Sequence, residues 1–196
     1  MEYWKYQAGV GVNITDKLLN YTILTPMSVI EWALVDHVER GTVLSETWLY
    51  EMIAGTVGKV TNRVRQIVAA LRRPGLPEDQ VSLLKETLER EMGDMKALFG
   101  TIDDILLSLK EGSQDQTVEA DGRSQTEDAW IRSWAARWMR LFRRKYAVEE
   151  NWVKEELAKP LPRPEPVQDV KMEAREEPTM NGHNGSRHDM ADESIE

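Results

Sequence analysis

Few residues of this 196-residue chain have types and spacing that suggest chemistry, and the first candidate is the stretch GTVGKVT at residues 55–61. It superficially resembles a phosphate-binding loop. Such a loop needs a glycine at the position of Ile53 and a serine or threonine at the position of Val60. The stretch also lies inside a helical pattern, in which Gly55 and Gly58 are expected to permit close packing of helices. We therefore predict no nucleotide site here.

The titratable residues do not suggest a catalytic or metal site either. Asp103 and Asp104 are adjacent, and adjacent helical residues point about 100° apart, so they cannot share a site. His37 stands alone, while His183 and His188 lack a third ligand nearby. The chain contains no cysteine, which excludes disulfides and thiolate chemistry. We expect no catalytic residue, no metal and no cofactor, and we predict that the protein is not an enzyme.

The stretch TEDAWIRSWAARWMRLFRRKY, residues 126–146, combines tryptophans at four-residue spacing with arginines. On a helix, with about 100° per residue, the two kinds of residue fall on opposite halves. The apolar half contains Trp130, Trp134, Trp138, Leu141, Phe142, Val148 and Trp152. The other half contains Arg132, Arg137, Arg140, Arg143 and Arg144, a basic patch in a chain of formal net charge −9.

Three explanations of this helix compete. A surface for single-stranded nucleic acid needs aromatic and cationic side chains on the same face, whereas the pattern segregates them. A helix lying on a membrane surface has a similar pattern, but the other helices offer matching apolar faces that could cover this one. We therefore predict that the tryptophans pack in a helical core and that the arginines face solvent or a partner. No stretch approaches about 18 uninterrupted apolar residues, so we expect no membrane-spanning segment.

Helical periodicity runs through most of the chain, and no alternating pattern predicts a strand. Thr25 and Pro26 suit the cap and first position of one helix, and Ser45 suits the cap of a long one. The predicted helices cover about residues 15–21, a segment from Pro26 towards Gly41, 46–71, 78–109 and 126–157.

The composition divides the chain into three segments. Residues 159–196 contain five of the eight prolines and almost no large apolar residue, so we predict a disordered, acidic tail. Residues 14–158 carry the helical pattern and are expected to form one domain. Residues 1–13 are expected to be an irregular N-terminal segment.

The order of several short motifs indicates which protein family the chain resembles. The stretch DKLLNYTILTPMSVIEWAL, followed by LSETWLYEMIAGTVGKVTNRVRQI and later by DAWIRSWAARWMRLFRRKY, resembles the third, C-terminal helical-repeat domain of the large subunit of the nuclear cap-binding complex, in a form that looks fungal. The matching positions are Asp16, Lys17, Glu31, Trp32, Ala33, Leu34, Tyr50, Glu51, Met52 and Ile53. That subunit is several times longer, so we expect this chain to correspond to a fragment of it.

The resemblance implies an all-α fold of antiparallel helical hairpins, of the HEAT-like type seen in the middle domain of translation initiation factor 4G. It implies a non-catalytic scaffold that supports the small subunit, which itself binds the methylated RNA cap, during splicing, export and decay. Capped RNA would then be an indirect partner, and the nucleus, with the cytoplasm, the expected location. The alternative is a helical-repeat RNA-binding domain of translation-factor type that uses the arginine face of residues 130–146.

Overall fold

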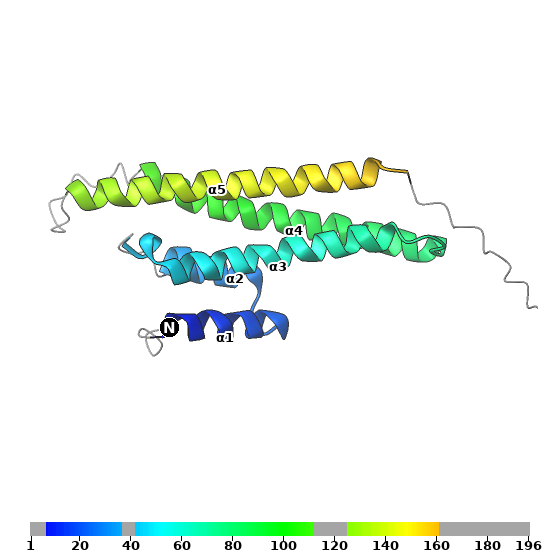
Figure 1. Cartoon of the computed structure of the whole chain (residues 1–196), viewed down its shortest axis with the longest axis horizontal. Helices are drawn as coiled ribbons and strands as arrows, with labels where there is room; N and C mark the ends of the chain where they lie inside the picture. The colour runs from blue at the N-terminus through cyan, green and yellow to red at the C-terminus, as the bar shows by residue number, and fades with distance from the viewer. Residues whose placement is uncertain (1–6, 37–41, 112–124, 161–196) are drawn as a thin grey trace, which may run out of the picture. The chain divides into compact units, whose positions relative to one another are not determined.

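The computed structural model describes residues 7–36, 42–111 and 125–160, and within these ranges the chain is helical with no β-strand. The all-α prediction is therefore confirmed. The elements, in chain order, are α1 (Ala8–Asn20), α2 (Pro26–Glu31), a π-helical turn η2 (Trp32–Asp36), a 3₁₀ turn η3 (Thr42–Ser45), α3 (Thr47–Leu71), α4 (Glu78–Glu111) and α5 (Gln125–Ala158) (Figure 1).

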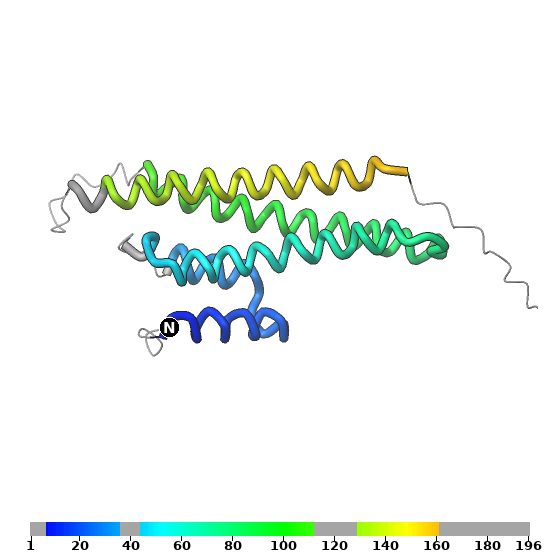
Figure 2. Tube along the Cα trace, viewed as in Figure 1, coloured from blue at the N-terminus to red at the C-terminus, as the bar shows by residue number. Residues whose placement is uncertain are grey.

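The long helices α3, α4 and α5 pack lengthwise against one another, and the colours of Figure 2 show that consecutive long helices run in opposite directions. A short turn joins α3 to α4, and its Gly75 adopts a φ of +78°, which favours glycine. The short helix α2 contacts both α3 and α4, whereas α1 packs on α3. The antiparallel hairpins expected from the resemblance are therefore present, with α3 in contact with every other α-helix.

The predicted helix boundaries agree with the structure at most ends. Thr25 caps α2: its Oγ1 accepts a hydrogen bond from the Ser28 amide at 3.1 Å, and the Thr25 amide donates to Ser28 Oγ at 3.2 Å. Pro26 occupies the first turn, as expected. The prediction for α3 was wrong by one position, because Glu46 rather than Ser45 precedes the helix and its side chain forms no capping hydrogen bond.

The first helix is longer than the sequence pattern indicated. We expected residues 1–13 to be irregular, but α1 already begins at Ala8. Glycine and β-branched residues have low helix propensity, so the stretch GVGV does not resemble a helix. Gly11 is buried within α1, and contacts with α3 outweigh this local preference. Residues 1–6 and the predicted tail beyond residue 160 lie outside the described residues.

The hydrophobic core lies between α2, α3, α4 and α5. Its members are mostly branched aliphatic residues at helical spacing, together with two alanines, two methionines, two phenylalanines and one tryptophan. The residues with the least exposure include Ile30, Leu34, Leu44, Leu49, Ile53, Val57, Leu98, Ile102, Leu106 and Trp138. Full burial of such side chains contributes about 1.5–3 kcal/mol each, so the core is the main source of stability of the bundle.

The buried face of α5 differs from the prediction. Trp138 is 2% exposed and Phe142 is buried, as expected, but Trp130 is 53% exposed and lies outside the core. Leu141 and Val148 are also exposed, and Trp134 and Trp152 are half-buried. The true core face contains Ile131, Ala135, Trp138, Met139, Phe142, Glu149 and Val153. It is rotated by roughly one residue position, ~100°, from the predicted face.

Gly55 and Gly58 do not serve the packing role expected of them. A Cβ atom built at either position would meet no heavy atom within 4 Å. Neither glycine is therefore required for close approach of another helix. Both lie in the interior of α3, where glycine is less favourable than alanine.

We expect Trp138→Ala to destabilise the protein by about 3–5 kcal/mol, because a fully buried aromatic side chain leaves a cavity. Trp130→Ala is the matched control on the same helix and should cost less than about 1 kcal/mol, since that indole is largely exposed. Urea unfolding monitored by circular dichroism measures both. Equal losses for the two variants would contradict the observed orientation of α5.

We also expect Gly55→Ala and Gly58→Ala to raise the free energy of unfolding by about 0.5–1 kcal/mol each, because the added methyl group meets open space and lowers the entropy of the unfolded chain. Denaturant midpoints of the two variants and the double variant measure this. A loss of stability in either variant would show that the glycine has a packing role.

Candidate partner-binding face

The five arginines of α5 named from the sequence are all exposed, and they spread over an arc from the side that faces α4, across the outer side, to the side that faces α3. Arg143 faces α4, where its Nε and Nη2 donate to the Asp103 carboxylate at 2.5 and 2.8 Å. The hydrogen bonds from Arg143 to Asp103 raise the pKa of the arginine. Arg132 lies three turns before Arg143 on the same side of the helix. Arg140 lies on the outer side, away from the core.

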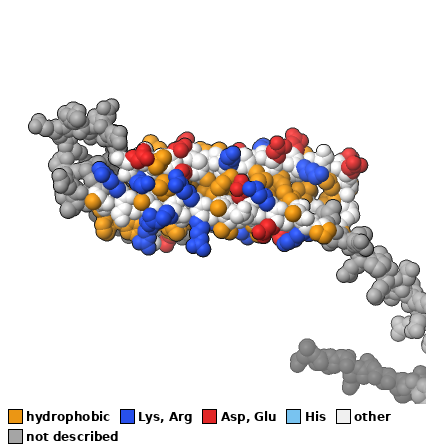
Figure 3. Space-filling view, turned by 90° about the horizontal axis from the view of Figure 1, so that it is seen from above, with side chains coloured by type: hydrophobic (Ala, Val, Ile, Leu, Met, Phe, Trp, Pro, Cys, Tyr) orange, Lys and Arg blue, Asp and Glu red, His pale blue; other side chains and the backbone are white. Residues whose placement is uncertain are grey.

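Arg137 and Arg144 lie on the side of α5 that faces α3. The Arg137 guanidinium lies over the Trp134 ring, 5.2 Å from its centroid. Trp134 in turn packs edge-on against Trp130, with centroids 5.9 Å apart. Aromatic and cationic side chains are therefore interleaved along this side of α5, and the prediction that they are segregated was wrong. Figure 3 shows basic side chains interspersed with hydrophobic ones towards the end of the molecule at which α5 begins.

Two hollows lie between α3 and α5 and form what we call the α3–α5 groove. One, of about 480 Å³, lies between Tyr50, Ala54 and Gly58 of α3 and Leu141, Arg144 and Val148 of α5. The other, of about 320 Å³, lies beside the start of α3. It is lined by Leu44, Ser45, Glu46, Thr47, Tyr50, Trp134, Arg137, Trp138 and Leu141. The two hollows are adjacent, because Tyr50 and Leu141 line both of them.

The sequence did not reveal this groove, because it depends on two helices that are far apart in the chain. Its only signal was a stripe of α5 at seven-residue spacing, the half-buried Trp134 and the exposed Leu141 and Val148, which we expected in the core. Tyr50 belongs to the YEMI motif of the resemblance and lies at the junction of the two hollows.

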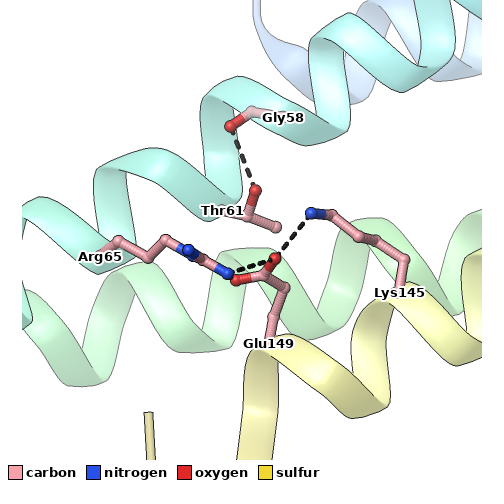
Figure 4. Close-up of polar contacts among 5 residues, drawn as sticks. All are labelled: Gly58, Thr61, Arg65, Lys145 and Glu149. Atoms are coloured by element: carbon pink, nitrogen blue, oxygen red, sulfur yellow. Dashed lines mark hydrogen bonds and ion pairs between the residues drawn. The ribbon is translucent and has the colours of Figure 1, made fainter. Parts of the chain in front are cut away.

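A buried carboxylate holds α5 against α3 beside the groove. Glu149 is 2% exposed, and Arg65 of α3 donates to it from Nε at 2.7 Å and from Nη2 at 3.1 Å (Figure 4). Lys145, one turn earlier on α5, donates from Nζ at 2.6 Å. Burial alone would raise the pKa of Glu149, but the hydrogen bonds from Arg65 and Lys145 outweigh it and hold the pKa below its ordinary value. Arg65 also lies over the Trp152 ring at 4.7 Å.

Other ion pairs join α3 to α1 and to α4. Lys59 donates to Asn20 Oδ1 at 2.6 Å and pairs with Asp16 at 2.7 Å, which joins α3 to α1. The hydrogen bond from Lys59 lowers the pKa of Asp16. Arg63 pairs with Glu91 of α4 at 2.9 Å. Asp16 is one of the motif residues of the resemblance, and its role here is structural.

The described residues contain no group of three or more histidine, cysteine, aspartate or glutamate side chains that could hold a metal ion. His37, His183 and His188 lie outside the described part of the chain. Among the helices of the described ranges, none is long and apolar enough to cross a membrane. The helical surface of the described residues includes an arginine-rich outer side of α5 and the apolar α3–α5 groove beside it.

The described ranges form an all-helical array of antiparallel hairpins, an arrangement typical of helical scaffold domains. Residues 1–151 match the family model described as MIF4G like, so the chain belongs to the MIF4G-like family. Over 67 residues the chain is 33% identical to nuclear cap-binding protein subunit 1 of Schizosaccharomyces pombe. The aligned part covers 34% of this chain and 8% of that protein. No solved structure matches the chain significantly.

We expect Glu149→Gln to lower the free energy of unfolding at pH 7 by about 1–3 kcal/mol, because it weakens hydrogen bonds to two cations. The folded-state pKa of Glu149 lies below the ordinary value of 4.5, so the carboxylate stabilises the fold above that pH. This contribution is lost as the pH falls through the folded-state pKa, and the difference between the two proteins should then shrink.

Urea unfolding at pH 7 and near pH 3 measures this difference. Glu155→Gln is the matched control, because Glu155 is exposed on the same helix and forms no ion pair with a described residue. An undiminished gap between wild type and Glu149→Gln in acid would show that the charge of Glu149 does not stabilise the fold.

Proposed function

We propose that this chain is a non-catalytic scaffold part of a nuclear mRNA cap-binding complex, in which it supports the small, cap-binding subunit. The observation that carries the proposal is the agreement of two comparisons: a MIF4G-like family match over residues 1–151, and 33% identity to a nuclear cap-binding protein subunit over 67 residues. The aligned stretch is a small fraction of that relative. The proposal therefore concerns one domain of such a subunit, acting in the nucleus and during mRNA export.

The ion pairs between the helices of the domain support a scaffold role. Ion pairs join α3 to α1, α4 and α5, and the Glu149 network fixes α5 on α3. A partner that contacts two helices at once needs their relative positions to be constant, since each rearrangement on binding costs free energy. This array of helices offers such surfaces without a catalytic constellation among the described residues.

The aromatic residues beside the α3–α5 groove are not arranged as a cap-binding sandwich. Holding a methylated guanine between two rings requires parallel, accessible faces. Trp130 and Trp134 are instead inclined at 68°, and Tyr50 packs edge-on against buried Trp138. Arg137 covers one face of Trp134. Capped RNA is therefore proposed as an indirect partner, reached through the small subunit.

The alternative function, direct RNA binding through the arginine side of α5, has one observation in its favour. Arg132, Arg140 and Arg144 form no ion pair with any residue that the structure describes, so their guanidinium groups are available to phosphates. Phosphate contacts carry no information about a cap or a sequence. Such binding would be salt-sensitive and equal for capped and uncapped RNA.

We expect the chain alone to show no preference for capped over uncapped RNA, and a cap preference to appear when the small subunit is added. Fluorescence anisotropy with both oligonucleotides at two salt concentrations, together with a pull-down of the purified small subunit, tests this. Failure to retain the small subunit would contradict the scaffold proposal. Salt-sensitive binding of both RNAs by the chain alone, lost on charge reversal of Arg132, Arg140 and Arg144, would establish the alternative.

A further inference from the structure

We propose that the α3–α5 groove is a docking site for an acidic amphipathic helix of a partner protein. This inference goes beyond the proposed function, because it depends on the groove and not on the complex to which the chain belongs. It rests on three observations: the spacing of the residues along both walls, their exposure, and the charges at the rim.

The two walls of the groove have complementary helical spacings. On α3, Tyr50, Ala54 and Gly58 recur every four residues and form one stripe. On α5, Leu141 and Val148 are seven residues apart and form the opposite wall. Ala54 has a small side chain and Gly58 has none, so the surface of α3 is recessed at these two positions. A ridge of side chains from a third helix can therefore approach both helices closely.

The groove exposes apolar surface in a continuous row. Leu141 is 45% and Val148 52% exposed, and the exposed Tyr50 lies opposite them. Trp130 extends the row beyond Trp134 at one end. Contiguous apolar residues with a polar rim are uncommon on surfaces that stay solvated and are typical of interaction sites. Large aliphatic side chains at i, i+4 and i+7 of a partner helix match these dimensions.

The charges at the rim of the groove determine which charges the partner helix should carry. Arg137, Arg144 and Lys145 line the α5 side, whereas Glu46 lies at one end on the α3 side. Lys145 is held by Glu149 and Arg137 by the Trp134 ring, but Arg144 has no ion-pair partner within the described residues. A helix with carboxylates along the edge that faces α5 is therefore complementary to this rim.

The same features disfavour single-stranded RNA as the occupant. Bases stack on open aromatic faces, but Arg137 already lies over the Trp134 ring, and the exposed Trp130 lines neither of the two hollows. The 480 Å³ hollow is lined mainly by aliphatic and small residues, which suit leucine or isoleucine rather than a base. Phosphates could contact the arginines but would leave the apolar floor unfilled.

The test uses the full chain and a synthetic helical peptide of about 18 residues, with leucines on one stripe and glutamates beside it. Two control peptides share its length: one scrambles the order, and the other replaces glutamate by lysine. Fluorescence anisotropy measures the affinity. We expect the acidic amphipathic peptide to bind at least about tenfold more tightly than either control.

Two pairs of variants locate the binding. Gly58→Leu fills the groove, and Gly55→Leu is its matched control, since both glycines lie in α3 with open space at Cβ but only Gly58 lines the groove. Arg144→Glu reverses the rim charge, and Arg132→Glu does so on the side away from the groove. We expect Gly58→Leu and Arg144→Glu each to weaken binding at least about tenfold, and the two controls to leave it unchanged. If Gly58→Leu alters the circular dichroism spectrum, the arginine pair decides.

Several outcomes would overturn the proposal. They are the absence of saturable binding of the acidic peptide, and equal effects within each variant pair. A third is an oligouridine probe that binds more tightly than the peptide and whose binding is weakened by Gly58→Leu. That result would make the groove an RNA site. A fourth is self-association abolished by Gly58→Leu in sedimentation experiments, which would assign the groove to a second copy of the chain.

Discussion

The arrangement of the long helices depends on one buried charge. Glu149 of α5 is enclosed between α3 and α5 and is satisfied by Arg65 and Lys145. A buried carboxylate without partners costs several kcal/mol, so α5 can neither rotate about its axis nor slide by one turn without losing the Arg65 pair. Apolar contacts alone would tolerate such shifts better, because they are not directional. The ion pair therefore specifies the register of α5 on α3.

The surface features described above follow from that register. With Glu149 facing α3, Trp138 and Phe142 point into the core, and Leu141 and Val148 emerge opposite Tyr50 and Gly58. Arg144, five residues before Glu149, is placed at the rim of the groove. A rotation by one residue position would bury Leu141 and remove the groove. The interaction that orders the interior thus also defines the face that a partner would meet.

How much could be predicted differs between elements. The limits of α3, α4 and α5 followed from apolar periodicity, because long helices average out local exceptions, and the order of short motifs indicated the family. The buried face of α5 did not follow, since three tryptophans dominated the pattern and a buried glutamate such as Glu149 adds nothing to an apolar pattern. The role of Gly55 and Gly58 depends on neighbours that only the fold supplies. The arginines of α5 were rightly expected at the surface, but their division between the α4 side and the groove requires the positions of Asp103 and Tyr50.

The basic residues of α3, which lie in a stretch that resembles the family, have a structural role. Within the described residues, every ion pair between helices except Arg143–Asp103 takes its cation from α3 or the residue after it. Lys59 reaches α1, Arg63 reaches α4, and Arg65 reaches α5. Arg72 donates to the backbone carbonyls of Glu156, Lys159 and Pro160 and so holds the last turn of α5, where the helix dipole favours a positive charge. The stretch GTVGKVT, which superficially resembles a phosphate loop, and the residues NRVRQ that follow it thus carry cations that organise the helices around them. A match in this stretch is therefore evidence for the fold, and the evidence for a partner has to come from exposed surfaces such as the rim of the α3–α5 groove, where Leu141, Arg144 and Val148 are turned away from the core.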